Sequence, residues 1–533
     1  MESKKYQAFW RGAIILTIAS FVTKVLSAFY RIPYQNIAGD IGFYIYQQIY
    51  PFYGFCLILA TYGFPIIISK MVAERLERGK KQEAEEIICV SFWFLLGIGF
   101  IGFFTLFFGA KAIATAMGDI HLDKLLRVIS FSFILMPFLS VARGYFQGFN
   151  NMMPTAVSQV IEQTIRVSII VFLSLFLIAH EFDLYTVGAG AMLGSIAGGL
   201  IGIIVLMLYM RHDFRSIFFK SVKRIKGKKK IIKILFWQGL AICVSNLVLI
   251  FIQMADSVSF YSLLIGAGEP AESAKVLKGV YDRSIPLMQL GTVVTTSFSL
   301  SLIPIITAAK ERGDLTFIRE KVRLAMKITF VIGFAAAIGL TCIIQPANIM
   351  LFENSDGSDV LSILSLSILF SSLSITTASI LQGLGQTLKP AIFVVFGGCL
   401  KLVLNYILMP YFGAKGAAIA TLVALIVISV LNSMLLMRAV SESLIDKRNM
   451  LGIVISGFSM GFVLIMFMRV LQMSGLVMDT SHRGVATFEA LLGVAIGGLA
   501  YMFLILKLRV FTKAEIGTVM KKEKKEGSLK KSG

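Results

Sequence analysis

Long apolar runs recur along the whole chain, and they constrain its fold more than any other feature. Each run holds about 20 mainly apolar residues, the length of α-helix that crosses a bilayer. Hydrophobic residues make up 57% of the 533 residues, and charged residues only 15%. A soluble core stops growing at roughly 250–300 residues, so a soluble protein would not need this much apolar sequence. The short alternating segments of a membrane β-barrel are absent. The sequence therefore predicts an all-α polytopic membrane protein.

Fourteen of these runs are separated by polar loops. They lie near residues 9–32, 43–69, 87–109, 126–145, 155–179, 185–210, 234–260, 284–308, 324–345, 360–384, 389–410, 415–437, 450–471 and 485–507. Lys and Arg gather in every second loop, whereas the loops at 180–184 and 346–359 contain neither. Because cytoplasmic loops carry such an excess, the pattern predicts a protein of the cell membrane with both termini in the cytoplasm.

The same alternation explains the net charge of +21, which therefore does not indicate a nucleic-acid partner. The five cysteines and four histidines are scattered, without the spacing of disulfides or metal ligands. No Gly-rich nucleotide-binding loop ending in Lys-Ser/Thr is present. We therefore expect no enzyme activity, no catalytic residue, no metal and no cofactor. A transporter of this kind would draw on an ion gradient, the membrane potential or the gradient of its substrate.

An internal repeat is the second strong signal in the sequence. Phe9-Trp10-Arg11-Gly12 opens the first span and Phe236-Trp237-Gln238-Gly239 opens the seventh. Pro65-Ile66-Ile67 closes the second span and Pro304-Ile305-Ile306 closes the eighth. Both copies start on the cytoplasmic side and hold six helices, so they are parallel repeats, a layout found in transporters that rock one lobe against the other.

The repeat divides the chain into four parts. We predict an N-lobe at 1–222 with spans 1–6, a C-lobe at 223–445 with spans 7–12, spans 13 and 14 at 446–510, and a basic cytoplasmic tail at 511–533. The fold class is thus all-α, with 14 transmembrane helices in two parallel six-helix repeats plus two extra C-terminal helices. Substrate sites in such proteins lie near the bilayer midplane, at the interface between the repeats.

Two cations lie inside the first predicted span. Lys24 and Arg31 are seven residues apart, which is two helical turns, so they share one helix face. A cation in the hydrocarbon region costs about 2.5–3.5 kcal/mol on insertion scales, and such residues usually face a protein interior or a wet cavity. We predict that both cations face a substrate cavity; the alternative is that their long side chains reach the membrane surface.

Charges in the later spans allow two interpretations. Asp256 or Asp282 could neutralise Arg283, or Arg283 could supply a further cation to the cavity from the C-lobe. Glu162 and Arg166 are four residues apart and are expected to pair on one helix face.

Lys401 and Asn405 are four residues apart in span eleven, in the region that corresponds to Glu162 and Arg166 of span five. Lys401 is a further candidate for lining the cavity or for forming an ion pair. Several cations in a medium of low dielectric constant attract a multivalent anion such as a diphosphate. A cationic drug would need carboxylates, and Glu162 is the single carboxylate within the first six spans.

Three local motifs resemble a known family. They are Thr23-Lys24-Val25-Leu26, Asp282-Arg283 at the start of span eight, and the Gln-Gly…Pro turns at 147–154 and 382–390. Together with the repeat, they resemble the multidrug/oligosaccharidyl-lipid/polysaccharide (MOP) flippase superfamily over the whole chain. Within it, the chain is most similar to the polysaccharide-biosynthesis group that contains the stage V sporulation protein B and the MurJ-type lipid II flippases.

The resemblance implies a function and a site. It implies that the protein flips a polyprenyl diphosphate-linked oligosaccharide or peptidoglycan precursor by alternating access, with Lys24, Arg31 and Arg283 on the diphosphate. It implies that spans 13 and 14 hold the polyprenyl tail. The expected partners are this lipid-linked glycan and membrane lipids; we expect a monomer, with cell-wall synthesis proteins as candidate associates.

The sequence also departs from the MurJ-type pattern. An arginine of span two is missing, and Gln47, Gln48 and Tyr50 occupy that region. An acidic residue expected after the second cation is replaced by Ile32-Pro33. Two alternatives therefore stay open: a cation-coupled multidrug exporter of the same fold, and a scaffold for cell-wall assembly without transport.

Overall fold

The computed structural model describes residues 2–210, 227–473 and 482–512, and every regular element within these ranges is a helix. The first half contains α1 (Glu2–Phe29), α2 (Arg31–Ile58), η1 (Leu59–Gly63), α3 (Phe64–Glu77), α4 (Lys81–Ala116), η2 (Ile120–Leu122), α5 (Asp123–Gly148), α6 (Met153–Ala179) and α7 (Leu184–Met210). The second half contains α9 (Lys228–Ile234), η4 (Leu235–Gly239), α10 (Leu240–Ser245), α11 (Val248–Gly266), α12 (Ala271–Asp282), α13 (Ser284–Glu311), α14 (Leu315–Cys342), α15 (Ile344–Phe352), α16 (Ser358–Gly383), α17 (Leu388–Val440), α18 (Lys447–Met473) and α19 (Arg483–Lys507).

Twelve helical segments among the described residues are long and apolar enough to cross a membrane. Two of them, Ile15–Glu77 and Leu388–Val440, are 63 and 53 residues long, far more than one crossing needs. Each contains a glycine with positive φ, Gly39 (φ 68°) and Gly413 (φ 54°), where the helix bends. The protein is therefore an all-helical, multi-pass membrane protein, as predicted; the count of fourteen crossings stays a prediction.

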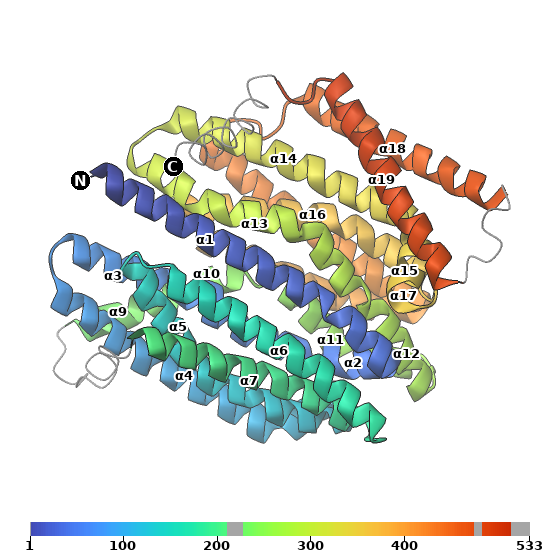
Figure 1. The fold of residues 1–533 in the computed structure, drawn as a ribbon, viewed down its shortest axis with the longest axis horizontal. Coiled ribbons are helices and arrows are strands. Elements are labelled where there is room, and N and C mark those ends of the chain that lie inside the picture. The colour runs from blue at the N-terminus through green and yellow to red at the C-terminus, as the bar shows by residue number, and fades with distance from the viewer. Residues whose placement is uncertain (1, 211–226, 474–481, 513–533) are drawn as a thin grey trace, which may run out of the picture.

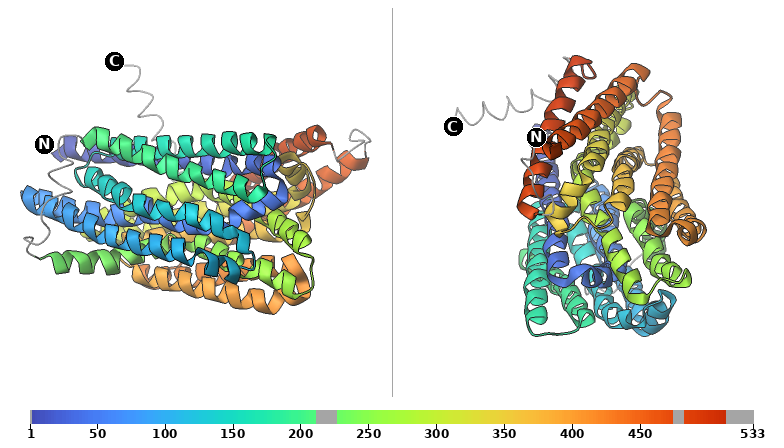
Figure 2. Two further views of the ribbon diagram at one scale, coloured as in Figure 1. Left: turned by 90° about the horizontal axis from the view of Figure 1, so that it is seen from below. Right: turned by 90° about the vertical axis from the view of Figure 1, so that its right-hand side faces the viewer.

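The helices form two bundles that pack in the same way. We call α1–α7 the N-lobe and α10–α17 the C-lobe. In the N-lobe α4 packs on α5, α3 on α5 and α1 on α6; in the C-lobe α14 packs on α16, α13 on α16 and α11 on α17. The same helix pairs thus meet in both halves, in agreement with the sequence repeat (Figures 1 and 2). The predicted boundary at 222/223 lies outside the described residues.

Helix α1 lies on the side of the N-lobe that faces the C-lobe, packed against α6 of its own lobe and α13 of the other (Figure 1). Helices α18 and α19 pack on each other and on α14 and α15 at the edge of the C-lobe, outside the repeat. The groove for a lipid tail that the resemblance implies there stays a prediction. The basic tail at 511–533 lies almost entirely outside the described residues.

The first crossing of the C-lobe is interrupted, although the sequence predicted one continuous span at 234–260. Between α10 and α11 the chain leaves helical geometry at Asn246 and Leu247. At the break, the hydroxyl of Ser245 donates to the backbone carbonyl of Ala241 (2.8 Å). The side-chain amide of Asn246 donates to the backbone carbonyl of Ile242 (2.8 Å). Such side-chain bonds to the backbone compete with the helix ladder. The side chains of Ser245 and Asn246 at this break lie where the two lobes face each other.

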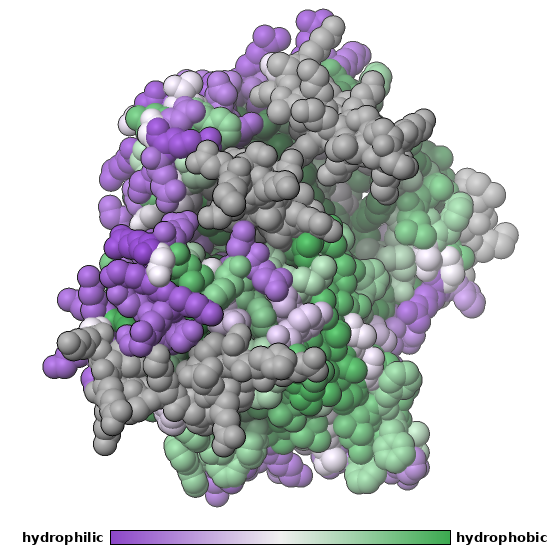
Figure 3. Space-filling model, turned by 60° about the vertical axis from the view of Figure 1, so that its left-hand side comes forward, coloured by the Kyte–Doolittle hydropathy of each residue, from purple (hydrophilic) through white to green (hydrophobic). Residues whose placement is uncertain are grey.

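The surface separates into a polar end and an apolar side. Figure 3 brings the left-hand end of Figure 1 forward and shows hydrophilic side chains gathered there, above and beside a broad hydrophobic flank. Large apolar side chains such as Phe104, Phe108 and Phe172 are exposed on the flanks of α4 and α6. An extended exposed apolar surface is what a helix bundle presents to lipid.

Candidate functional site

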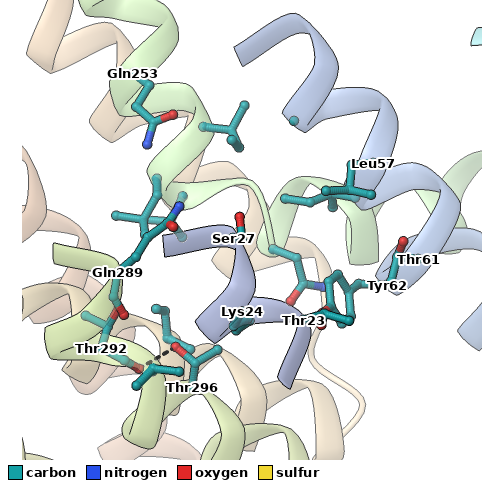
Figure 4. Close-up of a pocket in the computed structure, with 18 of the residues that line it drawn as sticks. Thr23, Lys24, Ser27, Leu57, Thr61, Tyr62, Gln253, Gln289, Thr292 and Thr296 are labelled. Atoms are coloured by element: carbon teal, nitrogen blue, oxygen red, sulfur yellow. Dashed lines mark hydrogen bonds between the residues drawn. The ribbon is translucent and has the colours of Figure 1, made fainter. Parts of the chain in front are cut away.

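A cavity lies between the N-lobe and the C-lobe. Its empty volume is about 1400 Å³, counting the open mouth, and α1, α2, η1 and α6 line it on one side with α10, α11, α13 and α16 on the other. Figure 4 shows Lys24 and Ser27 of α1 between the α13 side chains Gln289, Thr292 and Thr296 and the α2–η1 side. The lining consists mainly of amides, hydroxyls and aliphatic groups.

Lys24 lines this cavity, and the role toward a substrate that the sequence suggested for it stays a prediction. No carboxylate pairs with it within residues 2–210, 227–473 and 482–512. Because a charged side chain inside a membrane protein normally has a partner, an unpaired lysine in a polar cavity is available to a ligand.

Arg31 lies directly behind the cavity wall. It is fully buried, and its guanidinium donates to the Ser27 carbonyl (2.7 Å) and to Oε1 of Gln289 (2.6 Å), two residues of the cavity lining. The guanidinium also lies 4.3 Å from the ring centroid of Tyr50. Its Nε and Nη2 have no hydrogen-bond partner, and no acidic side chain of the described part of the chain neutralises it.

Arg166 of α6 joins Arg31 around the same aromatic side chains. It is fully buried, its guanidinium carbon lies 4.5 Å from the ring centroid of Tyr53 and 5.8 Å from that of Tyr50, and it donates to the Tyr30 hydroxyl (2.9 Å). The predicted pair between Arg166 and Glu162 is not formed. Arg166 therefore adds a third cation near the cavity.

Sequence reasoning missed this role of Arg166 because the i, i+4 spacing favoured Glu162 as its partner. In the structure, Glu162 forms an ion pair with Arg143 of α5 instead. Arg143 is fully buried and also donates to the Thr61 hydroxyl (3.1 Å). The single acidic side chain of the cavity lining is thus neutralised by a residue that sequence reasoning did not single out.

Arg283 does not reach the cavity, which corrects the prediction that it adds a cation there. It lies at the junction of α12 and α13 and forms a bidentate ion pair with Asp40 of the N-lobe. The distance from Nη2 to Oδ2 is 2.7 Å, and that from Nε to Oδ1 is 3.0 Å. Its Nη1 donates to Asn354 (2.6 Å). Neither Asp256 nor Asp282, the two partners weighed from the sequence, pairs with it.

Polar contacts between the lobes concentrate at this α12 end of the molecule. Besides the Asp40–Arg283 pair, Lys275 donates to the Tyr185 hydroxyl (2.7 Å) and lies 3.6 Å from Asp119. Toward the opposite end, Gly63 of the N-lobe packs closely on Cys243 of the C-lobe, where a Cβ on Gly63 would lie 2.0 Å from the Cys243 sulfur. The α12 end is therefore closed by charges that can separate into water.

The other predicted site residues lie inside the C-lobe, away from the cavity. Asp256 pairs with Lys401 (2.8 Å), and Asp282 forms an ion pair with Lys278 one helical turn before it. All four side chains are buried. Across the described ranges, no group of three His, Cys, Asp or Glu side chains has the arrangement of a metal site.

Comparisons with known proteins agree with this architecture. The family model of the polysaccharide biosynthesis proteins matches residues 9–310, more than half of the chain, and that of the MatE family matches residues 279–407. The chain is 41% identical over 515 residues to the uncharacterized membrane protein YabM of Bacillus subtilis (strain 168), covering 96% of this chain and 94% of the relative.

Two further relatives from the same organism cover almost the whole chain. Lipid II flippase MurJ is 26% identical, covering 92% of this chain and 94% of its own, and Stage V sporulation protein B is 25% identical, covering 96% and 97%. A solved structure of lipid II flippase MurJ in an inward closed conformation superposes with a TM-score of 0.65 over 93% of this chain and 99% of that chain, at 15% identity. The protein is therefore a membrane transporter of the polysaccharide biosynthesis protein family, within the MOP flippase superfamily.

Proposed function

We propose that the protein flips a polyprenyl diphosphate-linked oligosaccharide or peptidoglycan precursor from the cytoplasmic to the outer leaflet. The observation that carries the proposal is the charge around the cavity between the lobes. Lys24 lines it, Arg31 and Arg166 lie behind its wall without acidic partners among the residues that the structure describes, and Arg143 neutralises Glu162. Unbalanced positive charge in a medium of low dielectric constant attracts an anion.

A diphosphate matches this arrangement better than a monovalent anion or a cation. Arg31 and Arg166 add two positive charges close behind the lining, and a diphosphate carries more negative charge than a monovalent anion. The amides and hydroxyls around them, such as Gln159, Gln163 and Thr296, suit a sugar or peptide headgroup. A cationic drug would meet repulsion from Lys24, which argues against the multidrug-exporter alternative.

The pattern of contacts between the lobes suggests how the cavity changes access. We infer that the α12 end faces the outside and that the basic loops and both termini face the cytoplasm. Breaking the Asp40–Arg283 and Asp119–Lys275 contacts would open the cavity outward while the lipid tail stays in the bilayer. The energy source for this cycle remains a prediction: an ion gradient, the membrane potential or the substrate gradient.

Complementation of a bacterial strain depleted of its lipid II flippases tests the function. The wild-type protein should restore growth, and the Lys24→Ala variant should lose that ability, because the charge that meets the anion is gone. Lys111→Ala is the matched control, since Lys111 is an exposed lysine on α4 far from the cavity lining. Equal membrane levels of the two variants should be verified by immunoblot.

Binding to the purified protein separates the alternatives. Undecaprenyl diphosphate should bind, and undecaprenol, which lacks the phosphates, should bind at least about tenfold more weakly, since charge-assisted hydrogen bonds are worth roughly 1.5–3 kcal/mol. Binding of ethidium that disappears in Glu162→Gln would favour the drug exporter instead. Full growth with Lys24→Ala and no lipid binding would favour the scaffold.

A further inference from the structure

The C-lobe contains a buried cage of oxygen atoms around a single ammonium group. The Nζ atom of Lys401 lies 2.8 Å from Oδ1 of Asp256, 2.6 Å from the Ala417 carbonyl oxygen and 2.6 Å from Oγ1 of Thr421. The Tyr281 hydroxyl lies at 3.3 Å. Lys401 is fully buried, so its ammonium group is shielded from bulk solvent.

The donor set of this cage is that of a monovalent cation site. One carboxylate, one backbone carbonyl and two hydroxyls surround the charge, and carbonyl and carboxylate oxygens are the groups with which membrane proteins replace the hydration shell of such ions. The three N–H groups of the ammonium match the three short contacts one for one.

The oxygen atoms are held in place by further contacts. Asp256 accepts from Nδ2 of Asn405 (3.0 Å) and from the Tyr281 hydroxyl (3.0 Å), and Asn405 also donates to Ser259 (2.9 Å). The Thr421 hydroxyl lies 3.0 Å from the Ala417 carbonyl oxygen. The oxygen atoms of the cage thus also have contacts that do not involve the lysine, and Oδ1 of Asn405 remains a buried acceptor without a partner.

The cage joins separate crossings of the C-lobe. Asp256 lies on α11 and Tyr281 on α12, whereas Lys401 and Ala417 lie on either side of the bend at Gly413 in α17. A charge at this point holds these helices together, and without it Asp256 would be a buried anion with no counter-charge, which is strongly unfavourable.

We propose that the Lys401 ammonium is a covalently attached monovalent cation, which fills a site that would otherwise take a free NH₄⁺, K⁺ or Na⁺ ion. The C-lobe of this protein then needs no dissolved cation at this site to keep its packing. This inference concerns a different site from the cavity and does not depend on the identity of the transported lipid.

Thermal unfolding of purified variants in detergent tests the proposal. Lys401→Ala should unfold at a lower temperature than wild type in choline chloride, whose cation is too large for the cage. Replacing choline by NH₄⁺, K⁺ or Na⁺ at constant ionic strength should raise its midpoint by about 2–4 °C, with saturation, as expected for ligand binding to the folded state. The wild-type midpoint should not change, because its cage is full.

A double variant provides the control for charge. Asp256→Asn combined with Lys401→Met removes both the anion and the cation, so its midpoint should be insensitive to the type of cation. The proposal is overturned if no cation raises the unfolding midpoint of Lys401→Ala. It is also overturned if this variant fails to fold even when it is expressed and purified in high KCl. It is equally overturned if wild type shows a saturable response that Asp256→Asn abolishes, because the cage would then accept a free ion beside Lys401.

Discussion

Buried cations on the two sides of the central cavity differ in what surrounds them. On the N-lobe side Arg31 and Arg166 are held by aromatic rings, hydroxyls and amides, with no acidic partner in the described part of the chain. On the C-lobe side Lys401 and Arg283 each contact a carboxylate at 2.7–2.8 Å. All four cations are buried, but Arg31 and Arg166 carry unbalanced positive charge whereas Lys401 and Arg283 are each balanced by a carboxylate.

This difference indicates two uses for buried positive charge. A cation and the carboxylate paired with it have no net charge together, and the pair links the helices that carry the two side chains. A cation stabilised by ring quadrupoles and neutral acceptors keeps most of its field, which extends into the neighbouring cavity. We therefore expect substitutions in the carboxylate-paired groups to affect stability and conformation, and substitutions of Arg31 or Arg166 to affect ligand binding.

The largest effect is expected for Asp256→Ala. The substitution leaves the Lys401 charge buried without its partner, which should cost about 3–5 kcal/mol of folding stability. Thermal unfolding in detergent measures it. Asp359→Ala is the matched control, because its pair with Lys415 is exposed on both sides and should contribute no more than about 1 kcal/mol. Equal losses in the two variants would remove the distinction between buried and exposed pairs.

Asp40→Ala should have the next largest effect, and on conformation more than on folding. Truncating one partner of a buried, doubly hydrogen-bonded charge pair typically costs about 2–5 kcal/mol of the contact it supports. The α12 end should therefore open, so that a cysteine introduced at Gln289 becomes reactive toward an impermeant thiol reagent added from outside. Unchanged reactivity would mean that the Asp40–Arg283 contact does not close the cavity.

Arg31→Gln should weaken binding of undecaprenyl diphosphate about 10–100-fold while leaving folding intact. The Arg31 charge acts on the anion from just behind the lining, where two unit charges about 8 Å apart interact by roughly 2 kcal/mol at an effective dielectric constant of about 20. Removing a buried charge that lacks an acidic partner relieves its desolvation cost. Binding assays and thermal unfolding on the same sample measure both quantities. A large loss of stability with unchanged binding would reverse the comparison between the lobes.

The smallest effect is expected at Tyr50, whose ring lies 4.3 Å from the Arg31 guanidinium. Tyr50→Phe keeps the ring face and should change binding of undecaprenyl diphosphate little. Tyr50→Leu removes the ring and should weaken binding by about 0.5–2 kcal/mol, the range of cation–π contacts. If Tyr50→Phe and Tyr50→Leu were equally impaired, the hydroxyl and not the ring would hold Arg31.

The sequence by itself determined the membrane class and the helical repeat, and it singled out Lys24, which lines the cavity between the lobes. Hydrophobic run length, loop charge and repeated motifs are local properties, and each has a direct physical consequence in a bilayer. The family resemblance followed from the same motifs and is confirmed by the comparisons.

Only the tertiary structure decided which charges meet. Spacing along one helix favoured Glu162 with Arg166, yet Glu162 contacts Arg143 of a neighbouring helix. Arg283 pairs with Asp40, 243 residues away, and Lys401 with Asp256 on another helix. A buried charge takes the partner that helix packing brings within reach, and its distance along the chain carries no information about that choice.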